Sequence, residues 1–184
     1  MKIICKISTI IFGVVAMVSC LDGKKEQSVK INTVKEVKDA KAVVPDQFDQ
    51  GFTDGMTGTL WNYYSKIRLA LINSDTSETR TTAGDLKESF GDQHGDLKAI
   101  ASKMAEEENL EDQRKLFSDL TNGLEPIFKK AISEGVIYKQ FCPMAFNNKG
   151  AYWLSNVPEI RNPFYGDKML DCGSTREIIK NSKS

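Results

Sequence analysis

The sequence predicts a mainly α-helical protein: an antiparallel four-helix up-down bundle with a small C-terminal β-hairpin and turn-rich segment packed on it. Two observations favour this class. Apolar residues recur at spacings of three and four over residues 48–133, as they do on one face of a helix. After Gly135 the periodicity gives way to short β-branched and aromatic runs separated by turn residues. Because the links between the helices are short, neighbouring helices should run antiparallel.

The first helix is predicted to begin at Phe48. An apolar stripe at helical spacing consists of Phe48, Phe52, Met56, Leu60, Tyr63, Ile67 and Leu71. Beside it lie Gly51, Gly55 and Gly58, and each glycine costs about 1 kcal/mol in a helix interior. Either another backbone packs closely against these glycines, which we favour, or the first turns fray.

Three more helices are predicted from their capping signals. Asp75 followed by Glu78 forms a capping box that opens the second helix. The third is expected over residues 95–108, and Asn109 then caps the fourth. Pro126 lies inside the fourth helix, where we expect a kink or a restart.

The C-terminal segment is expected to contain two strands and several turns. Residues 136–141 and 151–154 are rich in β-branched and aromatic side chains and predict a hairpin, with residues 147–150 as its turn. Residues 162–166 have the composition of a tight turn. The last ordered piece is expected over residues 169–179. Such a segment cannot form a core alone, so it should pack on the helices.

Composition excludes several functional classes. The chain is 40% apolar and 27% charged with a formal net charge of zero, so no basic excess indicates a nucleic-acid partner. The single histidine, His94, excludes an HExxH motif and any zinc site of several imidazoles. No nucleophile elbow or comparable context is present. We therefore expect a protein that is not an enzyme.

The N-terminus has the layout of a secretory signal peptide. A positive start is followed by an apolar run over residues 7–18, which is shorter than the roughly 20 residues that cross a bilayer. The run ends at Ser19-Cys20, which resembles a bacterial lipobox with Met17 at the position of the more usual leucine. This pattern predicts lipidation of Cys20. The alternative is an uncleaved N-terminal anchor helix.

These signals predict the domain organisation and the location. Residues 1–19 would be a lipoprotein signal peptide, and residues 20–45 the acylated cysteine with a flexible tether rich in lysine and acidic residues. Residues 46–182 would form a single globular domain, helical over about 48–133 and rich in cysteine, methionine and aromatic residues over about 135–180. We expect this domain in the bacterial cell envelope, attached by its lipid to the periplasmic side of the outer membrane.

Two cysteines and two methionines form the candidate site. Cys5 leaves with the signal peptide and Cys20 carries lipid, so two thiols remain in a compartment where thiols can oxidise. They lie in two short motifs that pair each cysteine with a methionine, Cys142-Pro143-Met144 and Met169-Leu170-Asp171-Cys172.

The chemistry of these motifs favours a soft metal. Thiolates and thioethers select Cu(I) or Ag(I) over hard cations. On an extended chain, Cys142 and Met144 would point to the same face, and a helical turn would do the same for Met169 and Cys172. His94 could join only if the start of the third helix lies nearby.

A disulfide is the alternative for the same two residues. Two cysteines in an exported domain commonly form one bridge, and closing the loop between Cys142 and Cys172 would stabilise the fold by roughly 3–4 kcal/mol. The methionines would then belong to the core. Both alternatives stay open at this point, and the two states could alternate.

Two further residue pairs are interpreted by their position. Gln113 and Arg114, at the start of the fourth helix, are expected to form an exposed surface pair; the alternative is that they bind a carboxylate or backbone carbonyls. Tyr152 and Trp153 are expected to be buried against the helices.

Several C-terminal motifs also resemble a known family. They are Val136-Ile137-Tyr138, Cys142-Pro143-Met144-Ala145, Lys149-Gly150-Ala151, Trp153-Leu154-Ser155, residues 159–166 and residues 169–173. They are similar to a bacterial domain of unknown function common in Bacteroidetes. That family occurs as stand-alone lipoproteins and fused to periplasmic adaptor (membrane-fusion) subunits of copper/silver efflux pumps.

The resemblance implies a function in metal handling. It marks Cys142, Met144, Met169 and Cys172 as the metal-binding positions, with Cu(I) as the expected cofactor and a heavy-metal efflux adaptor or pump as a partner. Family members often carry histidines where this chain has Phe141 and Leu116, which leaves a sulfur-only site or a disulfide. The alternative function is a structural or protein-interaction module with a Cys142–Cys172 disulfide and no metal.

Overall fold

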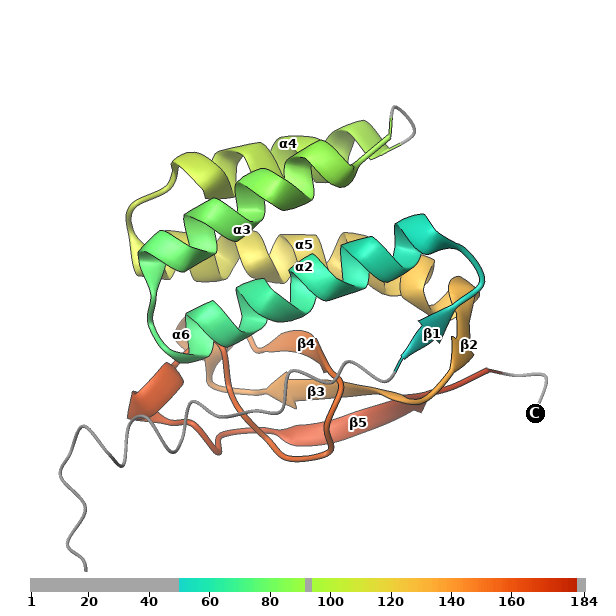
Figure 1. Ribbon diagram of the computed structural model, residues 1–184. Coiled ribbons are helices and arrows are strands. Elements are labelled where there is room, and N and C mark those ends of the chain that lie inside the picture. The colour runs from blue at the N-terminus through green and yellow to red at the C-terminus, as the bar shows by residue number, and fades with distance from the viewer. Residues whose placement is uncertain (1–49, 92–93, 182–184) are drawn as a thin grey trace, which may run out of the picture.

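The computed structural model describes residues 50–91 and 94–181 (Figure 1). In this part of the chain the protein is mainly helical and has two small antiparallel sheets, the larger of which lies in the C-terminal part. The predicted signal peptide, the Cys20 expected to carry lipid and the whole predicted tether lie outside the described residues. Within the described residues, none of the helices combines the length and the hydrophobicity needed to cross a bilayer.

Four long helices make up the first layer. α3 contacts α2 and α4, α5 in turn contacts α2 and α4, and a smaller contact joins α3 to α5 (Figure 1). Their bounds are Gly55–Ile72 for α2, Thr76–Ser89 for α3, Gly95–Glu106 for α4 and Leu110–Ala131 for α5.

The start of α2 differs from the prediction. The helix begins at Gly55 because Asp54 caps it: the Asp54 carboxylate accepts the backbone N–H of Thr57 at 2.8 Å and its hydroxyl at 2.9 Å. Phe52 lies instead in the short strand β1 (Gly51–Phe52), which pairs with β2 (Ile132–Glu134). Phe48 lies outside the described residues. The apolar periodicity of the sequence thus continues into residues that precede the helix, because the Asp54 cap sets where α2 begins.

Close packing at the glycine stripe was also a wrong prediction for two of its members. A Cβ on Gly55 would meet no atom within 4 Å, and one on Gly58 would meet only the Phe52 ring, at 4.0 Å. Gly51 alone has a close neighbour: a Cβ there would lie 3.0 Å from the Cβ of Glu134 on the paired strand. The absence of a side chain at Gly51 therefore allows close pairing of β1 with β2, and not close packing of a second helix.

The two caps predicted for the later helices are present, but the reciprocal bond of the Asp75 capping box is not, because the Asp75 N–H donates to the Ala70 carbonyl at 2.8 Å. The Asp75 carboxylate accepts the N–H of Glu78 at 2.9 Å, and the Asn109 side chain accepts from the first turn of α5 at 2.9 and 3.2 Å. The helix does not restart at Pro126, because α5 is one continuous helix across the proline. Leu124 and Phe128, on either side of the proline, are fully buried. This burial holds the helix together across the missing backbone donor.

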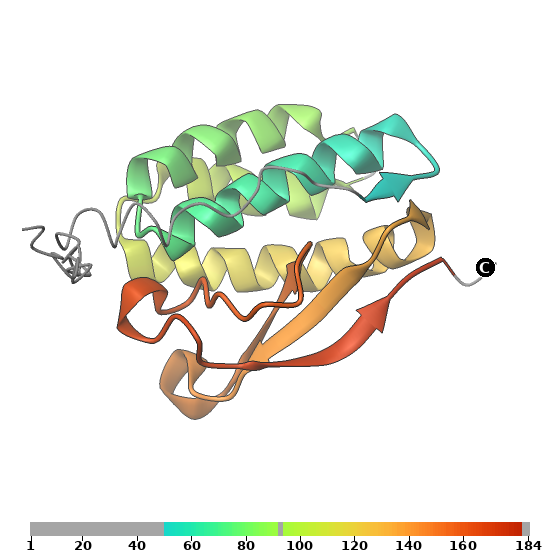
Figure 2. The ribbon, with the colours of Figure 1, turned by 60° about the horizontal axis from the view of Figure 1, so that its bottom comes forward.

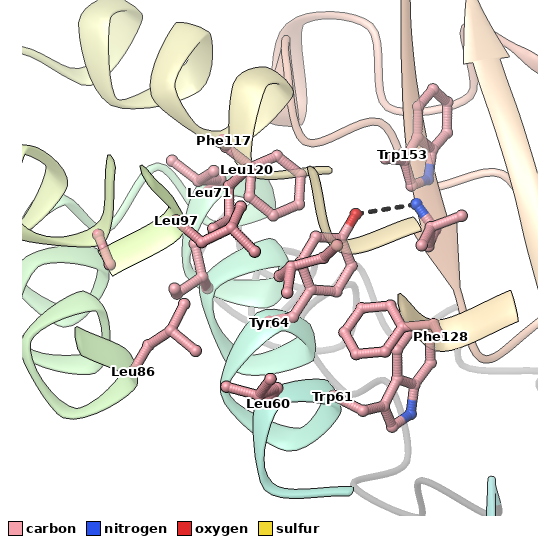
Figure 3. Packing of buried hydrophobic residues seen from close by; sticks show 14 of the residues in the cluster. Leu60, Trp61, Tyr64, Leu71, Leu86, Leu97, Phe117, Leu120, Phe128 and Trp153 are labelled. Atoms are coloured by element: carbon pink, nitrogen blue, oxygen red, sulfur yellow. Dashed lines mark hydrogen bonds between the residues drawn. The ribbon is translucent and has the colours of Figure 1, made fainter. Parts of the chain in front are cut away.

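The core lies among these helices and against the C-terminal segment (Figure 3). Tyr64 of α2 lies at its centre, stacked on Phe117 with ring centroids 4.9 Å apart. Its hydroxyl accepts the backbone N–H of Leu154 at 2.9 Å and lies 2.9 Å from the Thr121 hydroxyl. The phenol therefore joins the helical layer to a strand of the sheet.

The C-terminal layer is a three-stranded antiparallel sheet in the order β4-β3-β5. The predicted hairpin is present as β3 (Ile137–Cys142) and β4 (Ala151–Ser155). β5 (Ser174–Ile179) adds a third strand that the sequence did not predict, because nearly all of its side chains are exposed and it lacks an apolar face. The sheet lies below α5 in Figure 2, and a long connection between β4 and β5 carries the short η2 helix (Gly166–Lys168).

The turn between β3 and β4 has an unusual backbone. The Asn148 N–H donates to the Met144 carbonyl at 3.3 Å, which gives the turn the form of a short helix, α6 (Ala145–Asn148). Three successive residues nevertheless have positive φ: Phe146 at 52°, Asn147 at 59° and Asn148 at 64°. Gly150 follows at 78°. The predicted turn is thus confirmed, in a left-handed form that L-residues seldom adopt.

Candidate functional site

The structure brings the two cysteines together. Cys142 ends β3 and is fully buried, whereas Cys172 precedes β5 and is half-buried. Both are free thiols whose sulfur atoms lie 3.1 Å apart. Strand pairing explains this: β5 aligns with β3 so that Ser174 faces Phe141, which leaves Cys172 beside the end of β3.

The connection before β5 holds Cys172 in place through its backbone. The Asn162 side chain donates to the Cys172 carbonyl at 2.8 Å, and the Asn162 backbone N–H donates to the Leu170 carbonyl at 2.8 Å. Gly173 has φ of 147°, and a Cβ there would lie 2.7 Å from the Trp153 ring and 2.9 Å from the Phe141 carbonyl oxygen. Only glycine fits this approach, so the position of Cys172 depends on it.

The environment keeps Cys172 protonated. Its hydrogen bond with Cys142, burial and the electrostatic effect of Cys142 together raise the pKa of Cys172 to about 11. A nearby metal cation is the kind of charge that would reverse this and stabilise the thiolate. Burial and the neighbouring cysteines also raise the pKa of Tyr165. At neutral pH, Cys172 and Tyr165 are therefore neutral proton donors.

The two methionines lie near the thiols in sequence but differ in exposure. Extended backbone ends at Cys142, and Met144 is in the αR region with 44% of its surface exposed, so the extended chain on which the predicted shared face depended stops before Met144. The Tyr165 hydroxyl donates to the Met144 carbonyl at 2.7 Å and fixes this turn. Met169 is half-buried, and its carbonyl accepts the Cys172 N–H at 3.2 Å, which closes the single turn expected there.

His94 is not brought to the cysteines. It lines a cavity of about 560 Å³ together with Asp54 and Met56, at the start of α2. The Tyr165 turn packs at the other end of that helix, since a Cβ on Gly166 would lie 2.7 Å from the Ile72 carbonyl oxygen. An 18-residue helix is about 27 Å long, and this length separates the imidazole from the thiols. Among the described residues, no three His, Cys, Asp or Glu side chains group as metal ligands.

Gln113 and Arg114 are buried, so their interpretation as an exposed pair was wrong. The Gln113 amide donates to the carbonyls of Thr76 and Glu107 at 3.1 and 2.7 Å. Arg114 donates to the Pro163 carbonyl at 3.0 Å. The alternative, binding of backbone carbonyls, is what the structure shows. Arg114 thereby anchors the turn that carries Tyr165 to the start of α5.

The aromatic predictions are confirmed in part. Trp153 is fully buried, with its ring 5.9 Å from Phe164 and edge-on to it. Tyr152 is half-buried and lies against Phe141 of the neighbouring strand, with centroids 4.6 Å apart. Sequence reasoning assigned only a turn to residues 162–166 and missed that Asn162 and Tyr165 hold both cysteine motifs. The signal that the sequence offered was Asn162 directly before Pro163, because an asparagine side chain at such a position commonly bonds to nearby backbone.

Comparison with known proteins gives a family match for the helical part of the chain. Residues 60–134 match a family model described as Protein of unknown function (DUF3347). The helices thus resemble a known family. The DUF3347 match extends from α2 through β2 and ends before β3, so the cysteine motifs lie outside the matched residues. No curated protein and no solved structure gives a significant match to the chain.

Proposed function

We propose that this protein binds Cu(I) through Cys142 and Cys172 as a lipid-anchored accessory of heavy-metal efflux or homeostasis in the bacterial cell envelope. The observation that carries the proposal is the pair of free thiols 3.1 Å apart, one of them buried and the other half-buried. The two thiols are 30 residues apart in the sequence. Met144 and Met169, one on each motif, supply further sulfur. The protein is a binding protein and not an enzyme.

The donor chemistry suits a soft monovalent metal. Two thiols and two thioethers are soft ligands, and such sets select Cu(I) over hard divalent cations. Glu111, at the start of α5, is paired with Arg114 at 2.7 Å. His94 lies at the far end of α2 and takes no part. This donor set therefore disfavours calcium and magnesium.

The sulfur separation also suits a metal after a small movement. With metal–thiolate bonds of about 2.3 Å, two cysteines on one metal lie about 3.8 to 4.6 Å apart, depending on the bond angle. The thiols would have to separate by about 1 Å from their distance of 3.1 Å. Cys172 belongs to an irregular connection and not to a strand, so this connection can supply the movement.

The setting of the site rests on the sequence. The lipobox-like Cys20 supports attachment to the outer membrane, with the tether holding the domain away from the bilayer. The resemblance to domains fused to copper/silver efflux adaptors supports an adaptor or pump as the partner. Under this proposal the four helices act as an antiparallel up-down bundle that carries the site.

A second candidate function rests on the same distance. Thiols 3.1 Å apart are close enough to oxidise to a disulfide with little movement, which would make the protein a structural or protein-interaction module. Thiol counting on the folded protein as isolated separates the two candidates. Two free thiols with metal uptake support the metal site, whereas a bridge that resists mild reductant, with no uptake, supports the module.

The main test is a Cu(I) titration of the reduced mature protein against a competing chelator. We expect about one equivalent to bind, and we expect the Cys142→Ser/Cys172→Ser double variant to lose this binding. An unchanged affinity in the double variant would overturn the proposal.

A matched methionine pair tests the role of Met144. Met144→Leu removes a thioether beside the site, and Met56→Leu removes one that is similarly exposed, 49% against 44%, at the other end of α2. We expect weaker Cu(I) binding in Met144→Leu and wild-type binding in Met56→Leu. Equal affinities in the two variants would remove Met144 from the site and leave the cysteines as the ligands.

A further inference from the structure

A cavity beside the cysteine motif lies between the start of α5 and the left-handed turn. Its volume is about 410 Å³, and its lining includes Phe146, Asn147, Lys149, Phe164 and Tyr165. This volume lies within the range of pockets that hold small organic molecules. Neither the metal proposal nor the disulfide alternative uses this cavity.

The wall of the cavity is built by strained backbone. Phe146 and Asn147 have φ/ψ of 52°/57° and 59°/47°, which places two successive L-residues in the left-handed region. Such a conformation is unfavourable for a bulky residue and is concentrated at functional sites. Its effect here is to bring the Phe146 ring edge-on to Phe164, with centroids 5.2 Å apart. The two rings form an apolar wall.

The rim of the cavity carries an uncompensated positive charge. Glu111 at the rim is paired with Arg114 at 2.7 Å, and Lys115 is paired with Asp112 at 2.7 Å. Lys149 is exposed and forms no ion pair with any carboxylate of the described residues. An aromatic wall and a free ammonium thus meet in one cavity.

We propose that this cavity binds a small organic anion with a planar apolar body, such as an aromatic carboxylate. The apolar body would lie against Phe146 and Phe164, and the carboxylate would meet the Lys149 ammonium at the rim. Asn147 and Tyr165 line the same cavity. The site is separate from the thiols and does not depend on metal binding.

The test compares two probes of the same shape, one charged and one neutral. 2-Naphthoate and its neutral analogue, naphthalene-2-carboxamide, are titrated into isotopically labelled mature protein and followed by NMR. We expect both to shift the resonances of Phe146 and Tyr165, with 2-naphthoate binding about fivefold more tightly through the Lys149 ammonium. Equal affinities, or no shift of these resonances at about 10 mM probe, would overturn the proposal.

Variants locate the charge and the wall. Lys149→Ala should weaken 2-naphthoate binding about fivefold and leave the carboxamide unchanged, whereas Lys98→Ala, which removes an exposed lysine on α4, should change neither. Phe146→Leu should weaken both probes. Equal effects of Lys149→Ala and Lys98→Ala on 2-naphthoate would show a non-specific charge effect and overturn the assignment.

Discussion

The helical layer and the C-terminal segment are stabilised in different ways. Residues 55–131 form long helices whose backbone groups pair within each helix and whose apolar faces share one core. Residues 137–179 form three short strands and long irregular connections, held by side chains that bind backbone carbonyls. Gln140, for example, donates to the carbonyls of Val157, Pro158 and Glu159 at 3.1 to 3.3 Å. The helical layer thus depends on repeated backbone hydrogen bonds within each helix, and the C-terminal segment on individual hydrogen bonds from side chains to backbone carbonyls.

This difference explains where the candidate chemistry lies. The thiols, the Tyr165 turn and the cavity are all in or beside the irregular segment, while the helices supply a rigid support. The DUF3347 match follows the same division, because it covers the helices and stops at residue 134. The helical layer positions the site through a few contacts, and the predictions below address these contacts first.

The largest effect is expected at Arg114, which joins the two regions. Arg114→Leu would leave the Pro163 carbonyl without its buried donor, so we expect the free energy of unfolding to fall by about 3 kcal/mol in urea denaturation. Lys115→Leu, at the exposed neighbour, should change it by about 0.5 kcal/mol or less. A similar small change in both variants would mean that the regions are held together elsewhere.

A smaller loss is expected at the second joint. Tyr64→Phe keeps the ring but removes the hydroxyl that accepts the Leu154 N–H, and an unsatisfied buried donor costs about 1–3 kcal/mol. Hydrogen exchange of the Leu154 amide should become faster in this variant. Tyr63→Phe, at a half-buried neighbour, is the control and should leave both stability and exchange unchanged. Unchanged exchange at Leu154 in Tyr64→Phe would contradict the role of this bond.

The smallest effect is a gain within the C-terminal segment. Asn147→Gly should stabilise the protein by about 0.5–1 kcal/mol, because glycine adopts the observed φ of 59° without steric cost. Asn62→Gly, inside α2, is the opposite case and should destabilise the protein, since glycine is unfavourable in a helix interior. Thermal unfolding compares the two. Destabilisation by both substitutions would show that the left-handed turn is not strained.

The sequence predicted features that depend on a few neighbouring residues. Asp75 and Asn109 cap their helices as expected, because a cap needs only the next three residues. The hairpin of β3 and β4 follows from alternating side chains and a turn between them. The same local logic failed at Phe52, which lies before the Asp54 cap, and at Pro126, where buried side chains keep α5 continuous.

Tertiary structure decided the features that join distant parts of the chain. The sequence singled out Cys142 and Cys172 as the remaining thiols, but only the pairing of β5 with β3 places their sulfurs 3.1 Å apart. Tertiary packing also buries Arg114, which was expected at the surface, between the two regions. It places His94 at the end of α2 that is far from the thiols. The physical reason is that the hydrogen bonds of a cap or a turn involve only backbone groups a few residues away. Strand order, burial and side-chain contact depend on the free energy of packing the whole domain.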